Sequence, residues 1–187
     1  MAHQDSTQTQ SHTHSAEDPT CAVAHGDAPP DVGTRSLAVV FESPVAEYLL
    51  RFALDLGYQT TLVEPDPGRL GITSRPHGDR MASALDPSFI DKGTDVVVTD
   101  HHRPELGKVL RDALNTEARW VGVIGSVRHV APHVDALKEL GVDDDAIARV
   151  HRPVGLNIGS RTPAEIAIAT LAGLIADRNH RPGGFAF

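Results

Sequence analysis

The sequence predicts a three-layer α/β fold of Rossmann type, with a mainly parallel sheet, for residues 35–180. One observation is a set of short, largely apolar runs, such as 37–41 and 95–100, which are typical of strands buried on both faces. A second observation is that such runs alternate with segments whose apolar residues are three and four positions apart, the pattern of amphipathic helices. This alternation indicates parallel strands joined by crossover helices.

The first βαβ unit is expected at residues 37–64. A buried strand at 37–41 is followed by Ser43 and Pro44, which suit the N-cap and the first position of a helix. This helix ends at Gly57, a residue type favoured just beyond a helix C-terminus. A second strand at 59–64 completes a unit with a right-handed crossover.

The rest of the chain continues the alternation, although proline and glycine interrupt residues 65–92. Thr162-Pro163-Ala164-Glu165 has the form of a capping box and starts the last helix. The other expected elements are a short strand at 81–85, a strand at 95–100, a helix from about residue 105, a strand at 119–124, a helix that follows Gly125-Ser126, carries Val130 on its apolar face and stops at Gly141, a short helix at 146–150 and a final strand at 153–158.

The two ends of the chain differ from the predicted domain. Residues 1–34 carry five acidic side chains and no Lys or Arg, so they account for −5 of the net charge of −8. Their polar composition predicts a disordered tail, and residues 181–187 are expected to form a short C-terminal tail. Cys21 and the four tail histidines match no closed metal-site spacing, which favours a solvated tail over a metal site.

Composition excludes several functional classes. An acidic chain with 17 Lys plus Arg against 25 Asp plus Glu, and with 4% aromatic residues, is a poor candidate for nucleic-acid binding. A single cysteine allows no disulfide within the chain, which fits a reducing compartment. The sequence has neither the pattern of a signal peptide nor an apolar run of the roughly 20 residues that span a bilayer. We therefore expect a cytoplasmic protein.

Two Gly-Ser turns stand out as a candidate anion site. Each follows an apolar run and precedes a helix, so we expect free backbone N–H groups to point at one place. Arginine side chains nearby suit phosphate or carboxylate recognition. The alternative is that the turns only relieve strain and cap helices, with the arginines paired to surface acids. The residues concerned are Gly125, Ser126, Arg128, Gly159, Ser160, Arg161 and Thr162.

Asp100, His101 and His102 form the densest polar cluster, at the end of a predicted strand. They suit a metal ligand pair, a general base or anion contacts, because ligands of parallel sheets bind beyond the carboxyl ends of the strands. The alternative is a solvated loop in which Asp100 caps the next helix. Ser126 is a weak candidate nucleophile, because no Gly-x-Ser-x-Gly elbow surrounds it.

A nicotinamide dinucleotide is poorly supported at the first turn. The Gly-x-Gly-x-x-Gly fingerprint is replaced by residues 41–46, Phe-Glu-Ser-Pro-Val-Ala. Glu42 brings negative charge to the phosphate position, and Pro44 removes an N–H donor. Glu64 ends the second strand, near the position of a ribose-binding acid, and keeps an NAD(P)-dependent oxidoreductase as an alternative.

Three linked motifs resemble the C-terminal Rossmann-like domain of the XdhC/CoxI family. They are residues 119–126, 150–159 and 162–167, and the resemblance extends over residues 36–178. It implies an accessory protein of molybdenum hydroxylases such as xanthine dehydrogenase and carbon monoxide dehydrogenase. Such a protein binds molybdenum cofactor (molybdopterin), supports its sulfuration and helps insert it into the apoenzyme, as a chaperone rather than an enzyme. The apoenzyme, a cysteine desulfurase and a second copy of the chain are the partners expected.

The chain also departs from the family pattern at several positions. Glu42-Ser43-Pro44 replaces a glycine-rich turn, and residues 1–34 do not resemble the family's N-terminal domain with its cysteine motif. Asp100-His101-His102 stands where His-Asp-His is frequent, Asn157 where Asp is frequent, and Val127 precedes Arg128 where two basic residues are frequent. A non-binding regulatory paralogue is therefore a further alternative.

Overall fold

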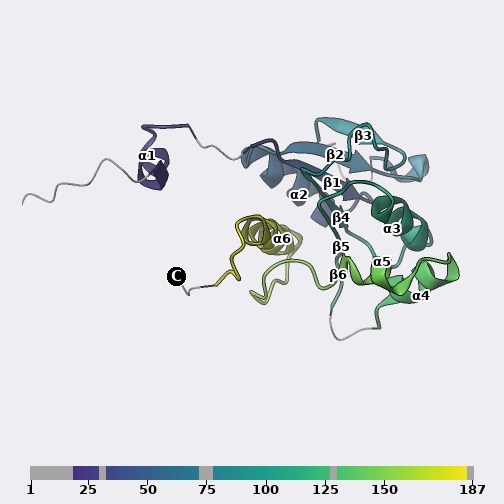
Figure 1. Ribbon diagram of the computed structural model, residues 1–187. Coiled ribbons are helices and arrows are strands. Elements are labelled where there is room, and N and C mark those ends of the chain that lie inside the picture. The colour runs from purple at the N-terminus through teal and green to yellow at the C-terminus, as the bar shows by residue number, and fades with distance from the viewer. Residues whose placement is uncertain (1–18, 30–32, 72–77, 127–129, 185–187) are drawn as a thin grey trace, which may run out of the picture. The chain divides into compact units, whose positions relative to one another are not determined.

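The computed structural model describes residues 19–29, 33–71, 78–126 and 130–184 (Figure 1). The chain forms two compact units, Met1–Gly33 and Thr34–Phe187. In the first unit, the helix α1 spans Pro19–His25, within the segment predicted to be a disordered tail. Among the residues described, no group of three or more His, Cys, Asp or Glu side chains could hold a metal ion.

The second unit is built on one six-stranded sheet, which confirms the predicted Rossmann-like α/β fold. All neighbouring strands are parallel, in the order β3-β2-β1-β4-β5-β6. The order reverses between β1 and β4, which makes the carboxyl ends of these two strands the topological switch point. The strands are β1 Ser36–Val40, β2 Gln59–Val63, β3 Arg80–Ala82, β4 Thr94–Val98, β5 Trp120–Val123 and β6 Val150–His151.

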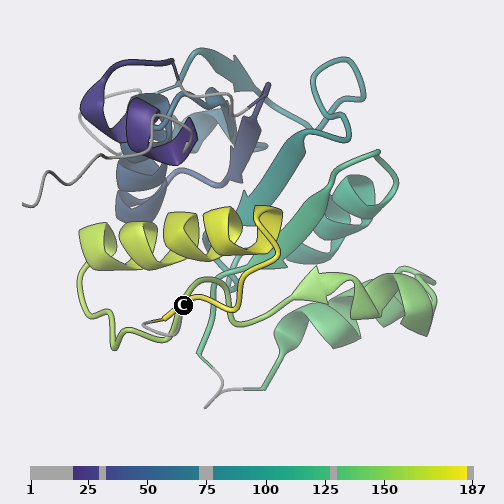
Figure 2. The ribbon, with the colours of Figure 1, turned by 60° about the vertical axis from the view of Figure 1, so that its left-hand side comes forward.

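Helices cover both faces of the sheet and complete three layers (Figures 1 and 2). The helices α2 (Pro44–Asp55) and α6 (Pro163–Arg178) share one apolar core with side chains of the sheet. The second core, on the other face, includes side chains of α3 (Leu106–Leu114), α4 (Pro132–Glu139) and α5 (Asp144–Ala148). A short 3₁₀ helix, η1, spans Pro67–Arg69. Within the described part of the chain, no helix has the length and apolar character to cross a bilayer.

The predicted helix starts at Ser43 and Thr162 are confirmed. The Ser43 hydroxyl accepts a hydrogen bond from the Ala46 amide at 3.1 Å, with proline at the start of α2. Thr162 and Glu165 form the expected capping box of α6. Such caps satisfy backbone donors that have no partner within the helix, and each typically contributes about 1 kcal/mol.

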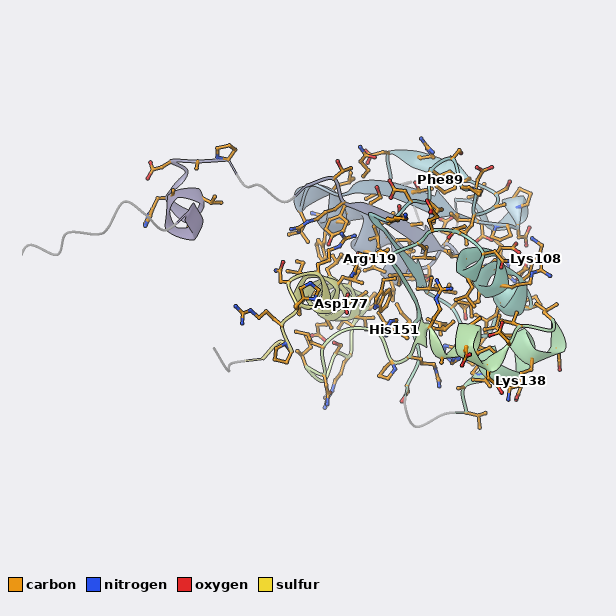
Figure 3. The ribbon with its side chains drawn as sticks, in the orientation of Figure 1. Phe89, Lys108, Arg119, Lys138, His151 and Asp177 are labelled. Carbon is orange, nitrogen blue, oxygen red and sulfur yellow. The ribbon has the colours of Figure 1, made fainter. Side chains whose placement is uncertain are left out.

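A buried ionic cluster fixes α6 against the sheet. Asp95 of β4 accepts hydrogen bonds from Arg119 at 2.7 Å and from Arg178 at 3.0 Å. Arg119 also pairs with Asp177, and Figure 3 shows these two side chains next to each other. Because Asp95 is fully buried, its charge needs these partners. The cluster therefore holds the C-terminal half of α6 in place.

The predicted strand at 153–158 is wrong. The last strand is only Val150–His151, and residues 152–162 form an irregular segment. Its backbone packs on α6 instead of on β5: the Leu156 amide donates to the Ala169 carbonyl at 3.0 Å. A Cβ atom on Gly155, whose φ is +88°, would lie 2.7 Å from the same carbonyl oxygen. The close approach of this backbone to a helix excludes a continuing strand.

Other predicted boundaries also move. The helix expected directly after Gly125-Ser126 begins only at Pro132, so Val130 lies outside it with 81% of its surface exposed. The short helix expected at 146–150 is α5, which ends at Ala148 because Val150 enters the sheet. The short strand expected at 81–85 is β3, which ends at Ala82.

Candidate functional site

A cavity of about 640 Å³ lies at the carboxyl edge of the sheet. Ser126, which follows β5, and the irregular segment Pro153–Arg161, which follows β6, line this cavity. Gly159, Ser160 and Arg161 thus share one cavity with Ser126, although about thirty residues separate them in sequence. Arg128 lies outside the described residues.

The backbone donors of the second Gly-Ser turn do not all point into this cavity. The Arg161 and Thr162 amides both donate to Glu165 Oε2, at 2.6 and 3.1 Å, and the Ser160 hydroxyl donates to the Glu165 carbonyl at 3.3 Å. The two amide hydrogen bonds lower the pKa of Glu165. The expectation of free N–H groups at Arg161 and Thr162 is therefore wrong, because the Glu165 carboxylate accepts a hydrogen bond from each of them. The Arg161 side chain itself is exposed.

Arg152 is a site residue that the sequence analysis missed. Its guanidinium donates to the Ser126 carbonyl at 2.9 Å and joins the two segments that line the cavity. A Cβ atom on Gly125 would lie 2.5 Å from Arg152 Nε, so the guanidinium needs glycine at this position. The signal in the sequence was its place in the His-Arg-Pro step directly before the segment 153–159.

The charge of Arg152 influences the pKa values of two histidines, His133 and His101. Burial lowers the pKa of His133, and the charge of Arg152 lowers it further. Burial also lowers the pKa of His101, followed by the charges of His102 and Arg152, while the backbone of Ile124 and the charge of Asp100 act in the opposite direction. His133 is 5% exposed, and its Nδ1 atom has no hydrogen-bond partner within the part of the chain that the structure describes. Neutral imidazoles beside an arginine can donate to an anion without adding charge to the protein.

The predicted Asp100-His101-His102 cluster lies at the switch point, beside this group but outside the cavity lining. The Asp100 carboxylate accepts from the His102 amide at 2.8 Å, so it stabilises its own loop. The rings of His101 and His102 lie 4.0 Å apart and are tilted by 39°. The two imidazole rings are therefore in contact at the start of the loop that follows β4.

Glu64 is placed at the end of β2, as predicted, but its carboxylate is engaged within the protein. Arg103 donates to its two oxygens at 2.8 and 3.2 Å, and the Asp66 and Glu42 amides donate at 3.0 and 2.9 Å. Burial raises the pKa of Glu64, but these hydrogen bonds outweigh it and leave the pKa below its ordinary value. Glu64 is an ionised, fully buried partner of Arg103.

Comparison with known proteins gives three results. A family model described as the XdhC Rossmann domain matches residues 37–174. The uncharacterized protein YqeB of Escherichia coli (strain K12) is 34% identical over 114 residues, which are 60% of this chain and 20% of that protein. A solved structure described as a xanthine dehydrogenase from Bacillus halodurans aligns with a TM-score of 0.62 and 25% identity, covering 79% of this chain and 45% of that chain. The chain thus spans less than half the length of these relatives.

Proposed function

Because this chain belongs to the family of XdhC Rossmann domains, we propose that it is an accessory protein of a molybdenum hydroxylase of the xanthine or carbon monoxide dehydrogenase type. In this role it binds phosphorylated molybdenum cofactor and assists its sulfuration or its insertion into the apoenzyme. The name of the Bacillus halodurans relative supports a client of the xanthine dehydrogenase type. The proposal also includes a cysteine desulfurase and a second copy of the chain as partners, in the cytoplasm.

The observation that carries this proposal is the cavity between Ser126 and residues 153–161. Its size is within the usual range for a small-molecule or cofactor site, about 300–1,000 Å³. Residues 153–161 belong to no strand, so backbone groups that face the cavity are suited to hydrogen bonds with the polar edge of a pterin. The bound cofactor would supply the redox chemistry of the client enzyme, and the residues of this chain would only hold and shield it.

Charge at the rim of the cavity supports a phosphorylated ligand. Arg161 contributes a guanidinium to the lining, and the charge of Arg152 lies beside Ser126. Guanidinium groups bind phosphate through two parallel hydrogen bonds. Glu165 opposes this attraction, but its carboxylate is turned toward the amides of Arg161 and Thr162. We therefore assign the ligand phosphate to Arg161.

The first test is a titration of the full chain with molybdenum cofactor, followed by co-elution of molybdenum and pterin fluorescence on size-exclusion chromatography. We expect Arg161→Gln to raise Kd about 10- to 100-fold, because a charged hydrogen-bonding group contributes about 1.5–3 kcal/mol. Arg51→Gln on α2 is the matched control, since it removes an equal charge from another exposed arginine. Equal Kd values for Arg161→Gln and the wild type would contradict this site, and no binding by the wild type would favour a regulatory paralogue.

A further inference from the structure

The switch point between β1 and β4 is the usual nucleotide site of a Rossmann-like sheet. Binding there needs three features. They are a turn after β1 whose backbone the ligand phosphates can approach, N–H donors at the start of the next helix, and an acidic side chain at the end of β2 that can bind the ribose. Side chains of this chain occupy or use each of these three features, as the following contacts show.

Phe41 fills the turn after β1. Its φ is +73°, a conformation that glycine adopts readily and a bulky residue rarely does, and its side chain is completely buried. The Thr99 hydroxyl donates to the Phe41 carbonyl at 2.8 Å and accepts from the Ser43 hydroxyl at 3.0 Å. These hydrogen bonds link the segments that follow β1 and β4, next to the place where a nucleotide would bind.

Arg103 covers the end of β1 next to Phe41. It follows β4, whereas its partner Glu64 ends β2, and β1 lies between these two strands. The ion pair, with its shortest distance at 2.8 Å, therefore crosses the end of β1. The Arg103 guanidinium lies 4.4 Å from the centre of the Phe41 ring, a cation–π distance, and the side chains of Arg103 and Glu64 are 4% and 0% exposed.

The start of α2 offers few donors to a phosphate. Pro44 has no N–H, and the Ala46 and Glu47 amides donate to the hydroxyl and carbonyl oxygens of Ser43. Glu42 and Glu47 add negative charge at this end of the helix. Both effects oppose a pyrophosphate at the first turn.

From this geometry we infer that Phe41, Arg103 and Glu64 make the chain selective for a pterin cofactor with a single phosphate, against its dinucleotide form and against NAD(P). The inference rests on the proposed function, because the pterin itself is assigned to the cavity at residues 153–161. That cavity lies at β5 and β6, so the attached nucleotide of the dinucleotide form would meet the switch point that these side chains close.

The test compares the wild-type chain with molybdopterin, with molybdopterin cytosine dinucleotide and with NADH, by equilibrium titration. We expect the dinucleotide form to bind at least about tenfold more weakly than molybdopterin, which corresponds to about 1.4 kcal/mol, and NADH not to bind at millimolar concentration. Equal affinity for the two pterin forms would overturn the inference and leave the proposed function intact. Failure of both forms to bind would overturn the proposed function, and the inference with it.

A gain-of-function variant sharpens the comparison. Phe41→Gly with Arg103→Ala removes the closing side chains, and we expect the preference for molybdopterin to fall to about threefold or less. The control is Phe89→Gly with Arg80→Ala, a second Arg–Phe pair at 5.1 Å. Arg80 is the first residue of β3, and Phe89 is labelled in Figure 3. Circular dichroism checks that the variant with Phe41→Gly and Arg103→Ala is folded. If it is folded and its preference for molybdopterin is unchanged, these two residues do not determine the selectivity. The wild-type comparison decides the question if that variant does not fold.

Discussion

Gly125 leaves room for the guanidinium of Arg152, which would lie 2.5 Å from a Cβ atom at this position. The contact is with a flexible side chain, so a substitution is accommodated by moving Arg152. The consequence of that movement is the loss of the hydrogen bond from Arg152 to the Ser126 carbonyl. At the scale of single residues, a glycine thus determines where a charged group stands at the cavity rim.

We expect Gly125→Ala to lower the free energy of unfolding by about 1 kcal/mol, the typical contribution of one hydrogen bond. Arg152→Gln should have a similar effect, and the double variant should lose no more than the larger single loss, because both changes remove the same contact. Urea denaturation of the three variants and the wild type measures this coupling. Strictly additive losses would show that Gly125 acts independently of Arg152.

Sequence reasoning succeeded for residues whose role depends on their neighbours in the chain, and failed where the role depends on distant ones. Ser43 and Thr162 were identified as caps because capping is a local pattern. Arg152 and His133 were missed, because only the folded sheet brings them to the same edge as Ser126. Glu64 was identified as the end of β2, but its pairing with Arg103 spans 39 residues and leaves no local signal.

At the scale of elements, the irregular segment 152–162 and the helix α6 form one packed unit. Gly155 and Gly173 touch directly, since a Cβ atom on Gly173 would lie 2.9 Å from Gly155 Cα. The largely apolar run Pro153–Ile158 predicts a strand. Its conformation is instead determined by contact with the backbone of α6, and the periodicity of the sequence does not indicate this contact. The position of the cavity lining therefore depends on the close approach of two glycines.

Gly173→Ala tests this contact by whether it raises or lowers the free energy of unfolding. Helix propensity alone predicts that alanine in a helix interior stabilises by about 0.5–1 kcal/mol relative to glycine. The clash with the Gly155 backbone predicts a loss of about 1–3 kcal/mol instead. Urea denaturation separates the two, with Ala172→Gly as a control that should show only the propensity effect. A more stable Gly173→Ala variant would disprove the close packing.

At the scale of the whole molecule, the net charge of −8 is divided unevenly, with −5 in residues 1–34 and −3 in the remainder. The domain therefore carries little net charge, and its individual buried groups determine how stability changes with pH. Among the described residues, the buried carboxylate of Glu64 has a lowered pKa and is protonated only in acid, below its ordinary value of 4.5. His101 and His133 have pKa values below 6.5, so they act at milder pH.

We expect the domain to lose stability as the pH falls from about 7.5 to about 5.5. The folded state holds His101 and His133 neutral, because burial and the charge of Arg152 oppose their protonation, whereas the unfolded chain takes up protons near pH 6.5. The unfolded state then binds more protons, so stability is complete above this pH and decreases below it, by at most about 1.4 kcal/mol per pH unit for each histidine. Urea midpoints across this range should decrease less steeply for His133→Asn than for the wild type. A wild-type midpoint that rises on acidification would contradict this prediction.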